Sequence, residues 1–149
     1  MTVDARVDDR GDVRRRLAAV PDRLAAAARS AVGRSVPAGE WGPSEVVRHL
    51  IAVEEVVWHA RLRQVAAADR PTWSWVEPEP WQGDPGATLD QLLAAFVARR
   101  GQTVAILDSF DEEAWTRIGR HETWGDLGVV ALMIRAVDHD DEHIAGLVG

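Results

Sequence analysis

The chain has 149 residues, a length that fits one domain with a single core, and 46% of the residues are apolar while 28% are charged. It contains no cysteine, which excludes disulfides, cysteine nucleophiles and cysteine-based zinc sites. The net charge of −7 argues against a nucleic-acid partner, because phosphate binding needs clustered positive charge. We therefore expect one globular domain over residues 1–149, with residues 1–10 as a candidate disordered segment, in which any metal is held by His, Asp or Glu.

The first two expected elements are helices. The first runs from about Asp12 to Val32, and Pro21 inside it predicts a kink or a restart. The second begins at Pro43, which suits a first helical position, and continues without Gly or Pro to about Ala68.

A long loop, Pro71–Ala87, separates these helices from the rest of the chain and carries Trp73, Trp75 and Trp81. Loops of this length in compact bundles are usually functional or disordered, and three tryptophans argue against disorder. Three roles are open for them: a lid over a binding site, a cover for one end of the bundle, or a dimer contact.

The third helix is expected to begin at Thr88, where Gln91 completes a capping box, and to end near Asp108. A short helical turn around Asp111–Trp115 follows, and the last helix runs from near Asp126 almost to the C-terminus. The chain shows no alternating strand pattern. Four helices joined by a short, a long and a medium connection predict an all-α fold of the four-helix-bundle type.

Helical wheels separate the histidines by face. His49 lies at the edge of the apolar stripe of the second helix and is expected to point inward, whereas His59 falls on the opposite face and is expected at the surface. His139 and His143 flank the apolar stripe of the last helix, four positions apart and on one face.

Two imidazoles at this spacing can bind one metal ion, and His49 from a facing helix would add a third ligand beside His139 and His143. Three protein ligands leave a coordination position open, as in catalytic sites. Imidazole ligands alone leave zinc, nickel, copper and iron open, and we expect zinc or nickel. The competing interpretation is a pair of surface histidines together with one hydrogen-bonded core histidine.

Further polar residues fall on apolar arcs, where an unpaired charge is costly. Asp140 would either orient a ligand histidine or pair with an arginine, and Glu54 would act as a general base or join a buried ion pair. Arg100 would bind a carboxylate of substrate or cofactor, or pair with an acidic residue. We expect Trp58 in the core and His121 as a surface or hydrogen-bonding residue.

Three segments resemble DinB-like proteins. Trp41–Leu50 resembles the opening of their second helix, where a Trp and a Pro precede a Glu and a His-Leu pair. His121–Leu127 resembles their lead-in to the last helix, and His139–Ile144 is similar to their closing motif, in which some relatives have Glu at the first His. In order and spacing the resemblance covers essentially the whole chain. It implies an up-down-down-up helical bundle with a metal bound by three histidines, here His49, His139 and His143.

The resemblance also implies relatives that use a low-molecular-weight thiol, namely mycothiol- or bacillithiol-dependent S-transferases and the mycothiol-dependent maleylpyruvate isomerase. An imported thiol fits a chain without cysteine. We predict a metal-dependent enzyme with a small-molecule substrate, either a thiol-dependent S-transferase or isomerase or a hydrolase that activates water. Two other classes stay open: a non-catalytic metal-binding or stress-response module with a closed site, and a helical interaction domain without metal.

Two predictions concern the protein's surroundings. No apolar run approaches the roughly 20 residues that cross a bilayer, and the N-terminal segment Met1–Asp12 is acidic and polar, unlike a secretory signal peptide. We therefore expect a cytoplasmic protein without a membrane partner, either a monomer or a homodimer.

Overall fold

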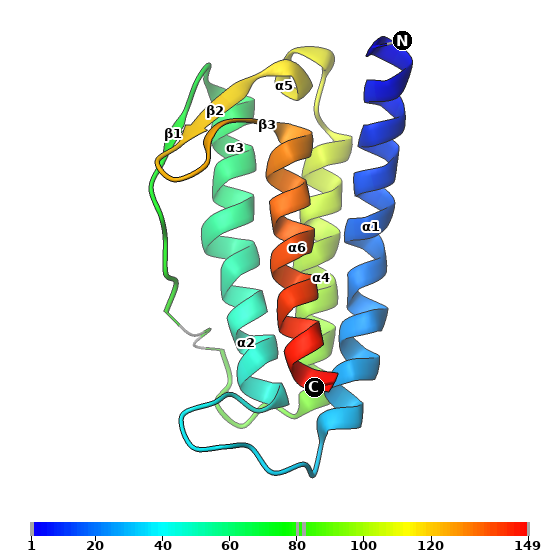
Figure 1. The fold of residues 1–149 in the computed structure, drawn as a ribbon, viewed down its shortest axis with the longest axis vertical. Helices are drawn as coiled ribbons and strands as arrows, with labels where there is room; N and C mark the ends of the chain where they lie inside the picture. The colour runs from blue at the N-terminus through cyan, green and yellow to red at the C-terminus, as the bar shows by residue number, and fades with distance from the viewer. Residues whose placement is uncertain (1, 80, 82, 149) are drawn as a thin grey trace.

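The computed structural model describes residues 2–79, 81 and 83–148, with side chains described from residue 9 onward. It is a bundle of four long helices (Figure 1). These are α1 (Thr2–Ala31), a second helix formed end to end by α2 (Pro43–Val53), η1 (Glu54–His59) and α3 (Ala60–Ala67), then α4 (Leu89–Asp108) and α6 (Val129–Val148). No helix in this described part is both long and apolar enough to cross a membrane.

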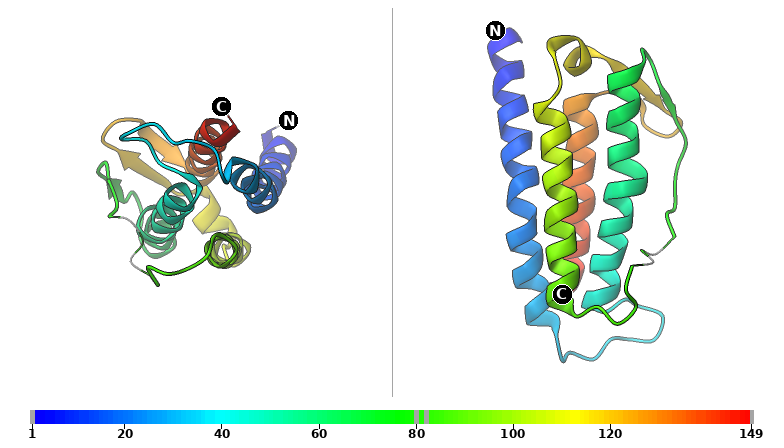
Figure 2. Two further views of the ribbon diagram at one scale, coloured as in Figure 1. Left: turned by 90° about the horizontal axis from the view of Figure 1, so that it is seen from below. Right: turned by 180° about the vertical axis from the view of Figure 1, so that it is seen from behind.

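The helices have the expected up-down-down-up topology. α1 and α6 run in one direction, while the second helix and α4 run in the other (Figures 1 and 2). α1 packs against α6 and α4, and α2 packs against α4. Because the second helix and α4 are parallel, the chain must return along the full length of the bundle between them. The segment between α3 and α4 makes this return on the outside, so the topology requires the long loop that stood out in the sequence.

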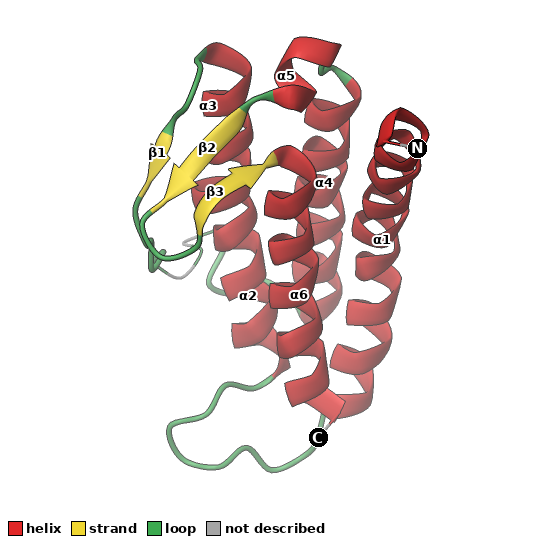
Figure 3. Cartoon of the chain, turned by 45° about the horizontal axis from the view of Figure 1, so that its top comes forward, coloured by secondary structure: helices red, strands yellow, loops and turns green. Residues whose placement is uncertain are grey.

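A small sheet lies near one end of the bundle, beside α3 and the start of α6 (Figure 3). It contains β1 (Thr72–Trp73), β2 (Ile118–His121) and β3 (Gly125–Gly128) in that order, with β1 parallel to β2 and β2 antiparallel to β3. The sequence shows no strand pattern here, because strands of two and four residues are too short to show alternation; they are a small addition to the all-α bundle that was predicted. α6 consequently begins at Val129 rather than near Asp126, while the short helix α5 (Glu112–Thr116) lies where it was expected.

The contact between Trp73 and Gly119 fixes β1 on β2. A Cβ atom at position 119 would lie 2.1 Å from Cη2 of the buried Trp73 ring, so only glycine fits. Gly119→Ala is expected to lower the free energy of unfolding by about 1–3 kcal/mol, as measured by urea denaturation. Gly101→Ala is the matched control: a Cβ there meets nothing within 4 Å in α4, and the helix should gain about 0.5–1 kcal/mol. Equal stability of Gly119→Ala and the wild type would contradict this close packing.

The π-helical segment η1 rotates the second helix relative to a regular wheel. A π turn holds more residues than an α turn, so the inward face shifts after Val53. The prediction of a surface position for His59 is therefore wrong, since this side chain is 2% exposed. Its Nε2 lies 3.0 Å from the carbonyl oxygen of Arg99 and 2.8 Å from Oγ1 of Thr103. A carbonyl only accepts, so Nε2 carries the ring proton and donates it.

α1 passes through Pro21 without a restart and begins at Thr2, ten residues before the expected start near Asp12. The predicted disorder of residues 1–10 stays a prediction, because residue 1 and the side chains of residues 2–8 lie outside the described residues. Pro21 has no backbone N–H, so the carbonyl of Leu17 lacks its partner one turn later. Nη1 of Arg100 supplies the missing donor at 2.9 Å.

Arg100 connects all four long helices at one level of the bundle. Its Nε donates to Oε1 of Glu54 in η1 at 2.7 Å, and its Nη2 donates to Oδ2 of Asp140 in α6 at 2.6 Å. Thr103 of α4 adds a hydrogen bond to Oε1 of Glu54 at 2.8 Å. We call these four side chains, together with His59, the polar layer. The apolar core forms two clusters, one above this layer and one below it.

Candidate metal centre

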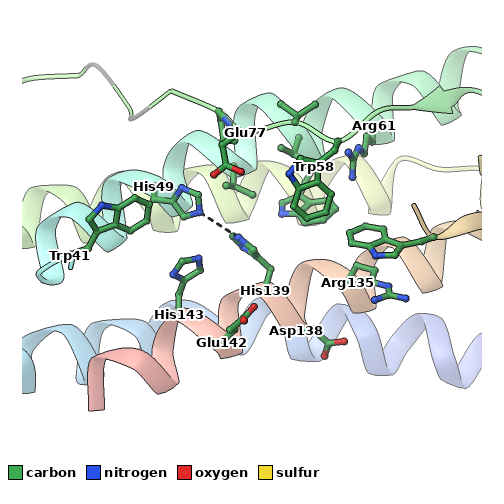
Figure 4. Close-up of a pocket in the computed structure, with 16 residues that line it drawn as sticks. Trp41, His49, Trp58, Arg61, Glu77, Arg135, Asp138, His139, Glu142 and His143 are labelled. Atoms are coloured by element: carbon green, nitrogen blue, oxygen red, sulfur yellow. Dashed lines mark hydrogen bonds between the residues drawn. The ribbon is translucent and has the colours of Figure 1, made fainter. Parts of the chain in front are cut away.

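Three imidazole rings converge where α2 approaches α6 (Figure 4). One nitrogen of each of His49, His139 and His143 lies within 4.8 Å of the other two. The Nε2 atoms of His49 and His139 are 3.4 Å apart. Two nitrogens bound to one tetrahedral zinc at about 2.0–2.1 Å are separated by about 3.3–3.4 Å. The structure therefore brings together the three histidines that the sequence selected, at spacings that small side-chain movements convert into a coordination site.

Regular helix geometry places these rings. His139 and His143 are one turn apart on α6, which stacks them on one face, and His49 lies in the regular part of the second helix before η1. Trp41, just before the first turn of α2, covers them on one side. Its ring centre is 4.9 Å from that of His49 and 6.2 Å from that of His143, the latter nearly parallel. From the sequence, Trp41 was noted only as part of the Trp41–Leu50 motif, and its contact with the histidine rings was not predicted.

The three rings are neutral near pH 7. Burial lowers the pKa of His49 and of His139 to about 4, and the neighbouring imidazoles act in the same direction. Burial also lowers the pKa of His143. Neutral imidazoles keep a nitrogen lone pair free for coordination, and a set of three imidazole donors suits zinc, nickel, copper or iron. The chemistry of this donor set therefore fits a divalent transition-metal ion.

A cavity of about 580 Å³ opens beside the three histidines. It lies between the second helix, α6 and the returning segment before α4 (Figure 4). Val53, Val57 and Trp58 contribute apolar wall on the second helix, and Trp75 and Trp124 do so from the loops. The volume suits a small-molecule ligand. An ion on the histidines would thus face a cavity able to hold a second molecule.

Two carboxylates line the cavity close to the histidines. The charge of Glu77, in the returning segment, acts to raise the pKa of His49 against the effect of burial, and Glu142 acts in the same way on His143. Both side chains are exposed. Sequence reasoning missed both residues. Glu77 lies in a loop without periodicity, and on a wheel Glu142 is simply the polar residue preceding His143.

Comparison with known proteins identifies the family. A family model described as the DinB superfamily matches residues 5–146. The chain belongs to the DinB superfamily. Among solved structures, YfiT from Bacillus subtilis superposes on this DinB-superfamily chain with a TM-score of 0.68 and 20% sequence identity, over 93% of this chain and 83% of YfiT. YfiT is described as a probable metal-dependent hydrolase with an unusual four-helix bundle topology, and at this identity the similarity shows the fold alone. No curated protein matches the chain.

The sequence also suggested three candidate catalytic or binding residues in this DinB-superfamily member, and all three lie in the polar layer. Glu54, Arg100 and Asp140 are each 1% exposed, and Arg100 forms an ion pair with each of the two carboxylates. For these residues the structure therefore shows the ion-pair alternative. Asp140 does not orient a ligand histidine: its carboxylate bonds Arg100, and Nδ1 of His139 is buried without a hydrogen-bond partner among the described residues.

The three tryptophans of the long loop lie in different parts of the structure. Trp75 lines the cavity, as expected for part of a lid. Trp73 is buried against the sheet, where its Nε1 donates to Oε1 of Gln64 at 2.8 Å. Trp81 lies within about 6 Å of the guanidinium groups of Arg48 and Arg99. One of the three therefore borders the candidate site, and Trp73 covers the sheet end of the bundle.

Proposed function

We propose that this protein is a metal-dependent enzyme in which His49, His139 and His143 hold one divalent cation, zinc or nickel. The observation that carries the proposal is the convergence of three neutral imidazoles on the wall of a 580 Å³ cavity. A cation held there would act as a Lewis acid and lower the pKa of a bound water or thiol. A non-catalytic metal-binding module predicts a closed site, so the cavity favours an enzyme.

A thiol is our first candidate for the nucleophile, which makes the protein an S-transferase or isomerase dependent on mycothiol or bacillithiol. The chain has no cysteine of its own, and the cavity is large enough for a small molecule in addition to a ligand at the histidines. Val53 and Val57 supply an apolar wall on one side of this space.

Water is the second candidate, and two carboxylates favour it. Glu77 and Glu142 line the cavity near the three imidazoles, where either can accept a proton from a nucleophile. The description of YfiT as a probable metal-dependent hydrolase supports the same reaction class.

Turnover by metal-free and reconstituted protein tests the proposal. The protein is stripped with a chelator, reloaded with zinc or nickel, and assayed with mycothiol or bacillithiol plus monochlorobimane, and separately with a panel of ester and amide substrates. We expect turnover only after reloading. In a hydrolase, replacing both Glu77 and Glu142 by Gln should lower the rate about 100-fold, whereas Glu79→Gln, an exposed neighbour of Glu77 on the same segment, should not. Absence of metal-dependent turnover with every thiol and every hydrolysable substrate would overturn the proposal.

A further inference from the structure

The cavity has a second polar end, at Arg61. This residue follows His49 by twelve positions, about three turns of the second helix, and also lines the cavity (Figure 4). It is 5% exposed. Nη2 donates to the carbonyl oxygen of Ser74 at 3.0 Å, but no carboxylate among the described residues pairs with this guanidinium. A buried cation without a counter-charge is costly, so an anion in the cavity would relieve the cost.

A neighbouring histidine adds a second donor. Nδ1 of His121 accepts hydrogen bonds from the backbone N–H groups of Thr123 at 3.0 Å and Trp124 at 3.3 Å. A neutral imidazole whose Nδ1 accepts must carry its proton on Nε2. This Nε2 lies 3.5 Å from Nη2 of Arg61. Both groups are donors, so neither satisfies the other, and one acceptor placed between them would serve both.

Trp58 adds a third donor. Its side chain is 3% exposed and lines the cavity, and its Nε1 is buried without a hydrogen-bond partner in the described part of the chain. The guanidinium carbon of Arg61 lies 5.6 Å from the centre of this ring. Buried indole N–H groups are nearly always hydrogen-bonded, so this unpaired N–H beside a cavity is a donor that the acceptor of a bound ligand would satisfy.

We propose that Arg61, His121 and Trp58, here named the donor corner, bind the carboxylate of a small-molecule acid whose apolar body lies along Val53 and Val57 toward the three histidines. A guanidinium matches the planar, singly charged carboxylate with two parallel hydrogen bonds, and the neighbouring N–H groups of His121 and Trp58 add donors for its two oxygens. The proposal names a substrate class for the same cavity. It rests on the proposed function only in taking the bound acid to be a substrate.

Binding of 4-phenylbutyrate to metal-free protein tests the donor corner, because without metal the acid cannot bind a cation instead. The indole N–H signal of Trp58 is followed by NMR on protein labelled with 15N at tryptophan, and its assignment comes from its absence in Trp58→Phe. We expect the acid to shift this signal to saturation and to bind at least about tenfold more tightly than the uncharged 4-phenylbutan-1-ol.

Two arginine variants sharpen the result. Arg61→Gln should weaken binding of the acid by about 10- to 100-fold and leave the alcohol unchanged, since only the acid uses the guanidinium. Arg63→Gln removes the same charge from an exposed position on the same helix and should change neither affinity. If Arg61→Gln fails to fold, comparing the affinities of the wild type for the acid and the alcohol still tests whether the donor corner binds the carboxylate.

Equal affinity for acid and alcohol, or a Trp58 signal that the acid does not move, would overturn the donor corner. This failure is distinguishable from failure of the metal proposal. Acid binding by a protein that takes up no metal would overturn only the metal centre. Metal uptake through the histidines without acid binding at Arg61 would overturn only the donor corner.

Discussion

Replacement of Arg100 by methionine is expected to lower the free energy of unfolding by about 3–5 kcal/mol. The substitution leaves the carboxylates of Glu54 and Asp140 buried without a counter-charge, and the Leu17 carbonyl without its donor. Burial already raises the pKa of Asp140, against the pull of Arg100 toward lower values. Urea denaturation followed by circular dichroism measures the loss.

Two further variants control for the Arg100 result. Arg99→Met removes the adjacent arginine of α4, which is partly exposed and pairs with Glu55, so its effect should stay below about 1 kcal/mol. Replacing Glu54, Arg100 and Asp140 together by leucine or methionine should recover most of the loss, because no unpaired charge then stays buried. Arg100→Met protein as stable as the wild type would contradict the role of the polar layer.

Loss of one imidazole is expected to cost most of the metal affinity. His139→Ala should weaken binding of zinc or nickel by about 100-fold or more, because one of three ligands is missing. Competition with a chromophoric chelator measures the affinity. Nickel should also quench the fluorescence of Trp41, whose ring lies against His49 and His143.

His59→Ala is the matched control for His139→Ala. It removes a buried histidine of the second helix that bonds Arg99 and Thr103 instead of facing the cavity. We expect this variant to lose stability and keep its affinity for metal. Metal affinity that depends on His59 as strongly as on His139 would show that the ligand set has been assigned wrongly.

The sequence predicts the candidate site well wherever the helices are regular. His49 precedes η1, and His139 and His143 lie on the unbroken helix α6, so a rotation of 100° per residue places all three on the correct faces. The same rotation places His59 on the wrong face, because η1 contains a π turn that the residue pattern does not predict.

Other features depend on partners far away in the chain. Glu54, Arg100 and Asp140 could be placed on apolar arcs, but a wheel cannot tell which of them meet, since they come from three different helices. The free carbonyl of Leu17 is predictable from Pro21, whereas its bond to Arg100 is not. The donor corner is also invisible in the sequence, because the lack of an acceptor is a property of the packed structure alone.

Metal analysis combined with X-ray absorption spectroscopy, on protein purified without a histidine tag, tests the central claim most directly. We predict one zinc or nickel ion per chain, with three imidazole nitrogens at about 2.0–2.1 Å in its first coordination shell. Protein that takes up no ion when either metal is supplied, or an ion whose shell contains no imidazole, would contradict the assignment of His49, His139 and His143 as the metal site.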